Sequence, residues 1–145
     1  ARPQYRKVVE KAHVSEAQAM LRTIYDSSER LAGEFGYRSY EDLVARKGQT
    51  GYSFARMDMF DSSSLPAGCS LVSSGTELRC KNFTYKASVY ADDVPYAAAK
   101  KRLSPYQNTL ILFDRDTQQL YCQEASGSSD ACDVFGLDTR SGVSF

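Results

Sequence analysis

ARPQYRKVVEKAHVSEAQAMLRTIYDSSERLAGEF, the first 35 residues of the chain, has the pattern of one long amphipathic α-helix. Apolar or small residues recur at steps of three or four positions, or their sum, which places them on one helical face: Val9, Ala17, Met20, Ile24, Leu31 and Phe35. Charged residues occupy the opposite face: Lys7, Lys11, Arg22, Asp26 and Glu29. Pro3 suits a first helical turn, and Gly33 and Gly36 mark the end of the helix.

The pattern changes after this helix. Ser39 followed by Asp42 resembles a capping box, which predicts a short helix over 40–46. Residues 48–81 are rich in loop-forming types, and within them 52–60 fits either a strand or a turn of helix. Alternating or continuous apolar patterns then predict four strands, 83–91, 96–103, 109–114 and 118–123. The second of these is weaker, and its alanines also allow a helix.

Strands that follow a helix rather than alternate with it indicate an α+β fold. We expect a long N-terminal amphipathic α-helix packed on a three- to four-stranded antiparallel sheet. One domain, 1–145, would comprise a helical stem and spine (1–35), an irregular connection (36–81), the sheet (82–123) and a disulfide-closed C-terminal region (124–145). The expected contacts between helix and sheet come from Met20, Ile24, Leu31, Phe35, Leu110, Leu112 and Phe113, although strand alternation must turn some of these outward.

The four cysteines indicate disulfides and therefore an oxidising compartment. Ten residues separate Cys69 from Cys80, and nine separate Cys122 from Cys132. Three pairings are possible, and we predict the two local ones because short loops close most readily. Each bond would contribute about 2–3 kcal/mol. A zinc site is disfavoured, because the cysteines are not closely spaced and the chain has a single histidine.

Composition and charge limit the classes of function that the chain can have. The 145 residues include 18 basic and 18 acidic side chains, and this neutral balance argues against an obligate nucleic-acid binder. No apolar run approaches the roughly 18 residues of a membrane helix, and no signal peptide is apparent in these residues. Because disulfides require export, we expect an export and anchoring segment to precede them.

No catalytic, cofactor or metal site is predicted. His13 is the only histidine, and no Ser-His-Asp set or phosphate-binding glycine loop accompanies it. Two weaker binding hypotheses remain open. One is a DNA-uptake patch at Lys100-Lys101-Arg102, near Tyr96 and Tyr106. The other is a calcium site, with three aspartates as candidate ligands: Asp130, Asp133 and Asp138.

Two stretches resemble type IV pilins. Pro3-Gln4-Tyr5, Val8, Ala12 and Val14-Ser15-Glu16-Ala17 are similar to the part of the first pilin helix that follows its membrane segment. Residues 109–122 resemble the last hairpin of the pilin sheet, and the pair Cys122 and Cys132 resembles the disulfide that closes the pilin C-terminal region. The segment 36–81 carries no such likeness, and a Cys69–Cys80 pair is not general to the family.

The resemblance implies a pilin-like α/β roll and a structural subunit of an extracellular type IV pilus-like filament, with no enzymatic activity and no cofactor. It implies a precursor that is anchored in the inner membrane, N-terminally methylated after processing, and displayed on the bacterial cell surface. Its partners would be copies of itself, other pilins and the inner-membrane assembly machinery. Subunit contacts are expected from the stem: Pro3, Tyr5, Arg6, Lys7, Val9 and Glu10. Arg2 and Lys11 would join the charged pairs between subunits.

Several alternatives remain open. The filament could serve adhesion, twitching motility or DNA uptake. The chain could instead be a type II secretion pseudopilin, or a free extracellular binding domain. In the filament hypothesis, the first fifteen residues project from the globular remainder of the chain, here called the head, and contribute little to its stability.

Overall fold

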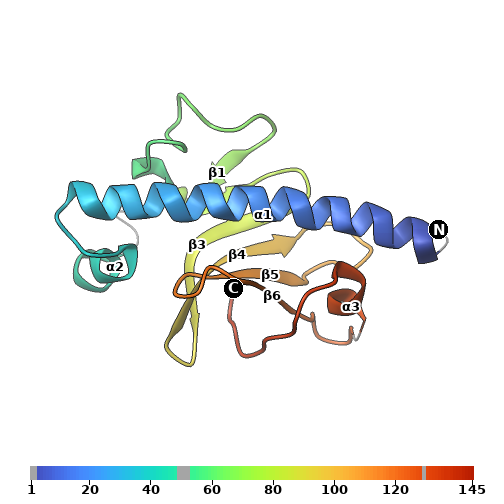
Figure 1. The fold of residues 1–145 in the computed structure, drawn as a ribbon. Helices are drawn as coiled ribbons and strands as arrows, with labels where there is room; N and C mark the ends of the chain where they lie inside the picture. Colours follow the sequence, from blue (N-terminus) through green and yellow to red (C-terminus); the bar gives the residue numbers. More distant parts are fainter. Residues whose placement is uncertain (1–2, 49–52, 129) are drawn as a thin grey trace.

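The structure is a computed structural model that describes residues 3–48, 53–128 and 130–145, and residues 3 and 4 by their helical backbone only. One long helix crosses one face of an antiparallel sheet, which makes the fold α+β (Figure 1). The helices are α1 (Pro3–Glu34), α2 (Tyr40–Lys47) and α3 (Ala131–Phe135), with 3-10 turns η2 (Phe54–Arg56) and η3 (Ser73–Gly75). The strands are β1 (Ser70–Val72), β2 (Glu77–Arg79), β3 (Phe83–Ala91), β4 (Val94–Lys101), β5 (Leu110–Asp114) and β6 (Leu120–Gln123).

The predicted helix is confirmed, although its apolar stripe differs in detail. The buried apolar side chains of α1 are Val14, Ala17, Leu21, Ile24, Leu31 and Ala32, while Met20 is half-buried against the same core. Phe35, predicted to meet the sheet, is 43% exposed. The physical reason is that α1 ends at Glu34 and the chain turns at Gly36, whose φ of +79° suits glycine. Phe35 therefore lies beyond the end of the helix and is not part of its buried apolar face.

The sheet has six strands in the order β1-β2-β3-β4-β5-β6, not three to four. The two additional strands form a hairpin inside the segment predicted to be irregular. Each is only three residues long, and neither has a clear alternating pattern. Residues 96–101 of the predicted strand 96–103 lie in β4 and are not helical, whereas 102 and 103 lie beyond its end. Asp92 and Asp93 form the preceding turn with positive φ. Of the segment 52–60, Tyr52 lies outside the described residues, and 54–56 form η2.

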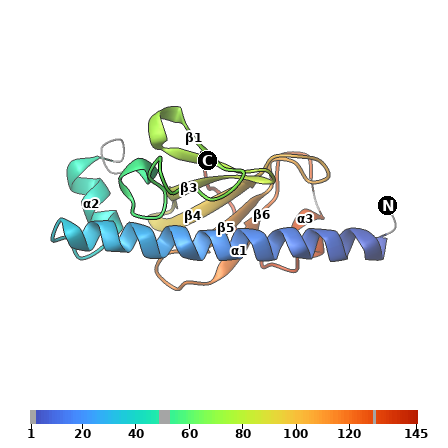
Figure 2. The same ribbon diagram turned by 90° about the horizontal axis from the view of Figure 1, so that it is seen from above.

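The sheet buries apolar side chains on both of its faces, which changes part of the predicted core. Ile111 and Phe113 face α1, whereas Leu110 and Leu112 face the opposite side. There they pack under the C-terminal segment, which lies on the far side of the sheet from α1 (Figure 2). The prediction that Leu110 and Leu112 contact the helix is therefore wrong. Because a strand buried on both faces reads as a continuous apolar run, its pattern does not indicate which residues face the helix.

Both predicted disulfides are confirmed. Cys69–Cys80 closes the β1–β2 hairpin, and Cys122–Cys132 joins β6 to α3. Their Cα–Cα separations are 4.1 Å and 5.5 Å. Each bond joins two neighbouring parts of the chain, as expected for short closed loops.

Candidate functional site

The first turns of α1 extend past the edge of the sheet (Figures 1 and 2). The side chains of Tyr5 and Val8 are 65% and 69% exposed, while Lys7 is also exposed and Arg6 and Val9 are half-buried. An exposed tyrosine and valine on one helical end offer apolar surface that this chain leaves uncovered.

A groove separates this helical end from the loop between β4 and β5. It has a volume of about 420 Å³ and is lined from two sides: Tyr5, Arg6, Val9 and Glu10 on α1, and Ser104 and Pro105 on the loop. The Arg6 guanidinium lies 5.9 Å from the ring centre of Tyr106 in the same loop. The groove therefore has apolar walls beside the charged side chains of Arg6 and Glu10.

Glu10 attaches α1 to the head. Its side chain is 2% exposed, and its Oε1 lies 3.3 Å from Nζ of Lys101 on β4 and 3.3 Å from Nδ1 of His13. Nζ of Lys101 also donates to the main-chain oxygens of Leu103 and Pro105. This buried ion pair fixes where the helix leaves the sheet.

Of the predicted subunit-contact residues, Tyr5 and Lys7 are exposed to solvent and Val9 is partly exposed. Arg6 is half-buried beneath its contact with Tyr106. Glu10 is buried and paired within its own chain, so its carboxylate is unsuited to the predicted contact between subunits.

The stem is shorter than predicted. The expectation that the first fifteen residues project from the head is wrong for Glu10 and Val14, which are 1% and 8% exposed. Pro3 belongs to α1, but its side chain, like all of Arg2, lies outside the described residues.

The predicted basic trio does not form one patch. Strand alternation directs Lys101 toward α1, where it pairs with Glu10, while Lys100 lines a cleft on the opposite face of the sheet. Arg102 lines the same cleft, and its Nη1 donates to the main-chain oxygens of Cys80 and Lys81 at 2.6 Å and 3.3 Å.

The predicted calcium ligands are exposed at the surface. Asp130 accepts a hydrogen bond of 3.3 Å from the Tyr106 hydroxyl, and Asp133 lies in α3. Across residues 3–48, 53–128 and 130–145, no group of three or more histidine, cysteine, aspartate or glutamate side chains is arranged to hold a metal ion.

The sequence patterns did not single out two of the cationic residues that line the cleft with Lys100 and Arg102, namely Arg79 and Lys86. Lys86 lies two positions from Thr84 in the predicted strand 83–91, so its face could have been inferred from alternation. Arg79 could not, because β2 was not predicted.

None of the helices in the described ranges combines the length and the apolar character needed to cross a membrane. Comparison of the chain with protein-family models, with characterised proteins and with solved structures finds no match.

Proposed function

We propose that the chain is the head of a pilin-like structural subunit that assembles with other copies through the exposed end of α1. The observation that carries this proposal is the exposure of Tyr5 and Val8 on a helical end that extends past the sheet. Burial of an exposed valine or aromatic side chain stabilises an association by roughly 1.5–3 kcal/mol, and a filament repeats that contact at every subunit.

The attachment of α1 supports this assembly. Glu10 and Lys101 hold the helix to β4 through a pair that is 2% and 3% exposed, so the exposed end leaves the head in a fixed direction. A fixed direction makes every contact between neighbours alike. Head-to-tail contacts extend into a helical filament when the rotation between neighbours does not close into a ring, and we propose that arrangement here.

The two disulfides support display outside the cell. Such bonds persist in oxidising surroundings and reinforce small domains against unfolding. Precursor anchoring in the inner membrane, adhesion and motility all belong to this proposal as consequences of pilus-like assembly.

The proposal is tested by replacing the exposed apolar side chains of Tyr5 and Val8 and measuring filament assembly in the cells that produce the protein. The double variant Tyr5→Ser/Val8→Ser is introduced into the natural precursor, and filaments sheared from the cells are quantified by immunoblot. We expect the chain to fall at least about tenfold in the sheared fraction, since that loss requires only about 1.4 kcal/mol, while its level in the cell is unchanged.

A matched control removes similar groups elsewhere. Tyr90 and Met59 are 45% and 46% exposed and lie away from the start of α1. Tyr90→Ser/Met59→Ser should leave filament incorporation at the wild-type level. Equal incorporation of both double variants would contradict assembly through this end of α1.

A further inference from the structure

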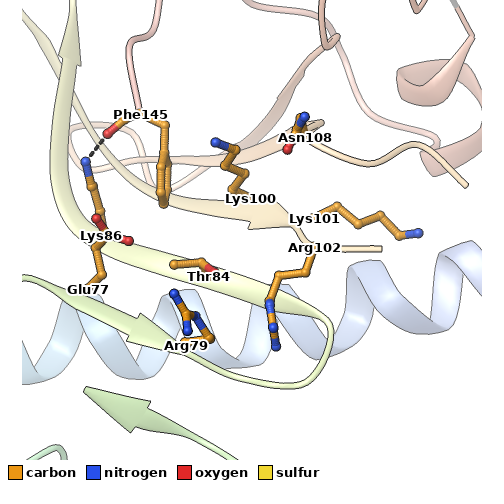
Figure 3. Close-up of a pocket in the computed structure, with 9 residues that line it drawn as sticks. All are labelled: Glu77, Arg79, Thr84, Lys86, Lys100, Lys101, Arg102, Asn108 and Phe145. Carbon is orange, nitrogen blue, oxygen red and sulfur yellow. Dashed lines mark hydrogen bonds between the residues drawn. The ribbon is translucent and has the colours of Figure 1, made fainter. Parts of the chain in front are cut away.

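A charged cleft lies on the face of the sheet opposite α1. It has a volume of about 430 Å³, within the roughly 300–1,000 Å³ of small-molecule sites. Figure 3 shows Thr84 near its centre with cationic side chains on all sides. The cationic residues that surround Thr84 come from β2, β3, β4 and the position directly after β4: Arg79, Lys86, Lys100 and Arg102.

The strand register produces this arrangement. Thr84 on β3 lies directly opposite Arg79 on β2 and directly opposite Lys100 on β4. Lys86 and Arg102 follow Thr84 and Lys100 by two positions, so they share the same face. Neighbouring strands are about 4.8 Å apart, which brings the four cations around one hydroxyl.

Among the described residues, no aspartate or glutamate side chain forms an ion pair with any of the four cations of the cleft. The ammonium of Lys86 donates to the main-chain oxygen of Phe145 (Figure 3). Glu77 is the only acidic side chain that the described part of the chain contributes to the lining, and it accepts a 3.3 Å hydrogen bond from the Ser73 hydroxyl. Lys101 lines the cleft in part, but its ammonium pairs with Glu10 on the α1 side. The whole chain is neutral, so this excess is a local feature.

Arg79 and Lys100 each lie diagonally across from Lys86 on the neighbouring strand, where like charges repel, so an anion in the cleft would lower this repulsion. We propose that the cleft binds a compact, multiply charged phosphate compound, either a free oligophosphate or the phosphate headgroup of a lipid. This site is separate from the assembly surface on α1 and does not depend on the proposed filament.

The geometry favours phosphate over a carboxylate ligand. A phosphate group presents up to two charges and three acceptor oxygens, so adjacent phosphates can meet several cations together. Arg79 and Arg102 supply planar donor forks, while Lys86 and Lys100 supply point charges. The Thr84 hydroxyl and the Asn108 amide add neutral donors to the same lining.

The aromatic content disfavours single-stranded nucleic acid. Such ligands bind by stacking successive bases on exposed rings. Phe145 is the only aromatic residue of the lining in the described chain, and Nζ of Lys86 and Lys100 lie 4.7 Å and 5.5 Å from its ring centre. With cations against its ring, Phe145 is a poor stacking platform. The cations also cluster around one point, which suits a compact anion better than an extended strand.

Isothermal titration calorimetry on the purified chain at low salt tests the proposal with inorganic tripolyphosphate as the probe. We expect one-to-one binding that weakens at least about tenfold in Arg79→Gln/Lys100→Gln and falls with added salt. Citrate, a compact tricarboxylate, should bind more weakly than tripolyphosphate.

A matched double variant removes the same two charges from the exposed end of α2. Arg46→Gln/Lys47→Gln should bind tripolyphosphate as the wild type does. The melting temperature of Arg79→Gln/Lys100→Gln at low salt should equal or exceed that of the wild type, because repulsion between neighbouring cations is removed. This measurement separates loss of binding from loss of folding.

Vesicles containing phosphatidic acid distinguish the two sources of phosphate. Binding to vesicles that depends on Arg79 and Lys100 assigns the lipid headgroup, and binding of soluble tripolyphosphate alone assigns a free oligophosphate. The proposal is overturned if neither probe binds at about 1 mM, or if both double variants weaken binding equally. Tighter binding of an oligodeoxythymidine than of tripolyphosphate would also overturn it, in favour of a nucleic-acid site.

Discussion

Nη2 of Arg115 lies 2.8 Å from Oε1 of Glu29, and the Arg115 side chain is fully shielded from solvent. Its guanidinium also pairs with the carboxylate of Glu41 and lies 4.9 Å and 5.1 Å from the ring centres of Tyr25 and Tyr40. Arg115 follows β5, Glu29 lies in α1 and Glu41 in α2. One buried cation therefore joins both helices to the sheet.

Arg115→Met should lower the free energy of unfolding by about 3 kcal/mol, measured in urea melts. Loss of one partner from a buried ion pair typically costs about 3–5 kcal/mol. The lower end applies because Glu29 and Glu41 are 28% and 22% exposed and retain some hydration. The control is Arg30→Met, which breaks a pair with Asp58 that is about half exposed. That variant should lose no more than about 1 kcal/mol, and equal losses would contradict the linking role of Arg115.

Ile24→Ala should destabilise the fold by roughly 2–5 kcal/mol, because Ile24 is fully buried between α1 and the sheet. Phe35→Ala should cost less than about 1 kcal/mol, since its ring lies at the surface near Arg56. The sequence pattern places both residues on one stripe, so denaturant melts of the two variants distinguish the observed helix end from the predicted one. A loss below about half a kcal/mol for Ile24→Ala would show that the helix does not pack there.

Glu10→Gln should destabilise the head by about 2–3 kcal/mol, because it leaves the ammonium of Lys101 buried beside a neutral amide. Deletion of residues 1–7 should leave the thermal midpoint nearly unchanged, because Tyr5 and Lys7 are exposed. Differential scanning calorimetry compares the two changes. A large loss on deletion, with little effect of Glu10→Gln, would place the attachment point earlier in α1.

Alkaline pH should weaken the fold through Tyr40. Burial raises the pKa of Tyr40 to about 12 from an ordinary value near 10, because the phenolate is poorly solvated there. Tyr40 therefore contributes stability that is complete below pH 10 and is lost as the pH rises toward 12, by up to about 1.4 kcal/mol per pH unit. Urea melts at pH 8, 10 and 11 should show a steeper decline for the wild type than for Tyr40→Phe. Parallel declines would contradict this assignment.

The two disulfides should differ in access to reductant. Cys69 is half-buried, whereas Cys122 and Cys132 are buried. Stepwise reduction followed by alkylation and mass spectrometry should label the Cys69–Cys80 pair first. Replacement of Cys122 and Cys132 by serine should cost about 2–3 kcal/mol, as expected for a loop of about ten residues. If Cys122 and Cys132 were labelled before Cys69 and Cys80, the result would contradict the observed burial.

The features predicted from sequence are those with strong local signals. The helical period identifies α1, the alternation around Tyr85 identifies β3, and short spacing identifies both disulfides. The β1–β2 hairpin was missed because its strands are three residues long and depend on the neighbouring strand and the disulfide for their stability.

Other features depend on contacts between distant segments. Arg115 follows Asp114 at a predicted turn, where a charged residue is usually solvated, and only the fold brings Glu29 and Glu41 to it. Alternation in β3 also fails after Lys86, because the register shifts there and Val89 packs on the outer face. Residue patterns alone did not reveal Glu10 as an attachment point, since its partner Lys101 is 91 positions away in sequence.

The strand order of the sheet has a consequence for how the chain reaches its native state. Every strand pairs with the strand next to it in sequence, so the whole sheet can form by successive hairpins without closing a long loop. Low contact order of this kind favours rapid folding. The helix α1 is synthesised first, and its contacts with β4, β5 and α3 span longer stretches of chain than the pairings between neighbouring strands do. We expect the hairpins to form early and α1 to dock late, so the core stays open until the sheet is complete.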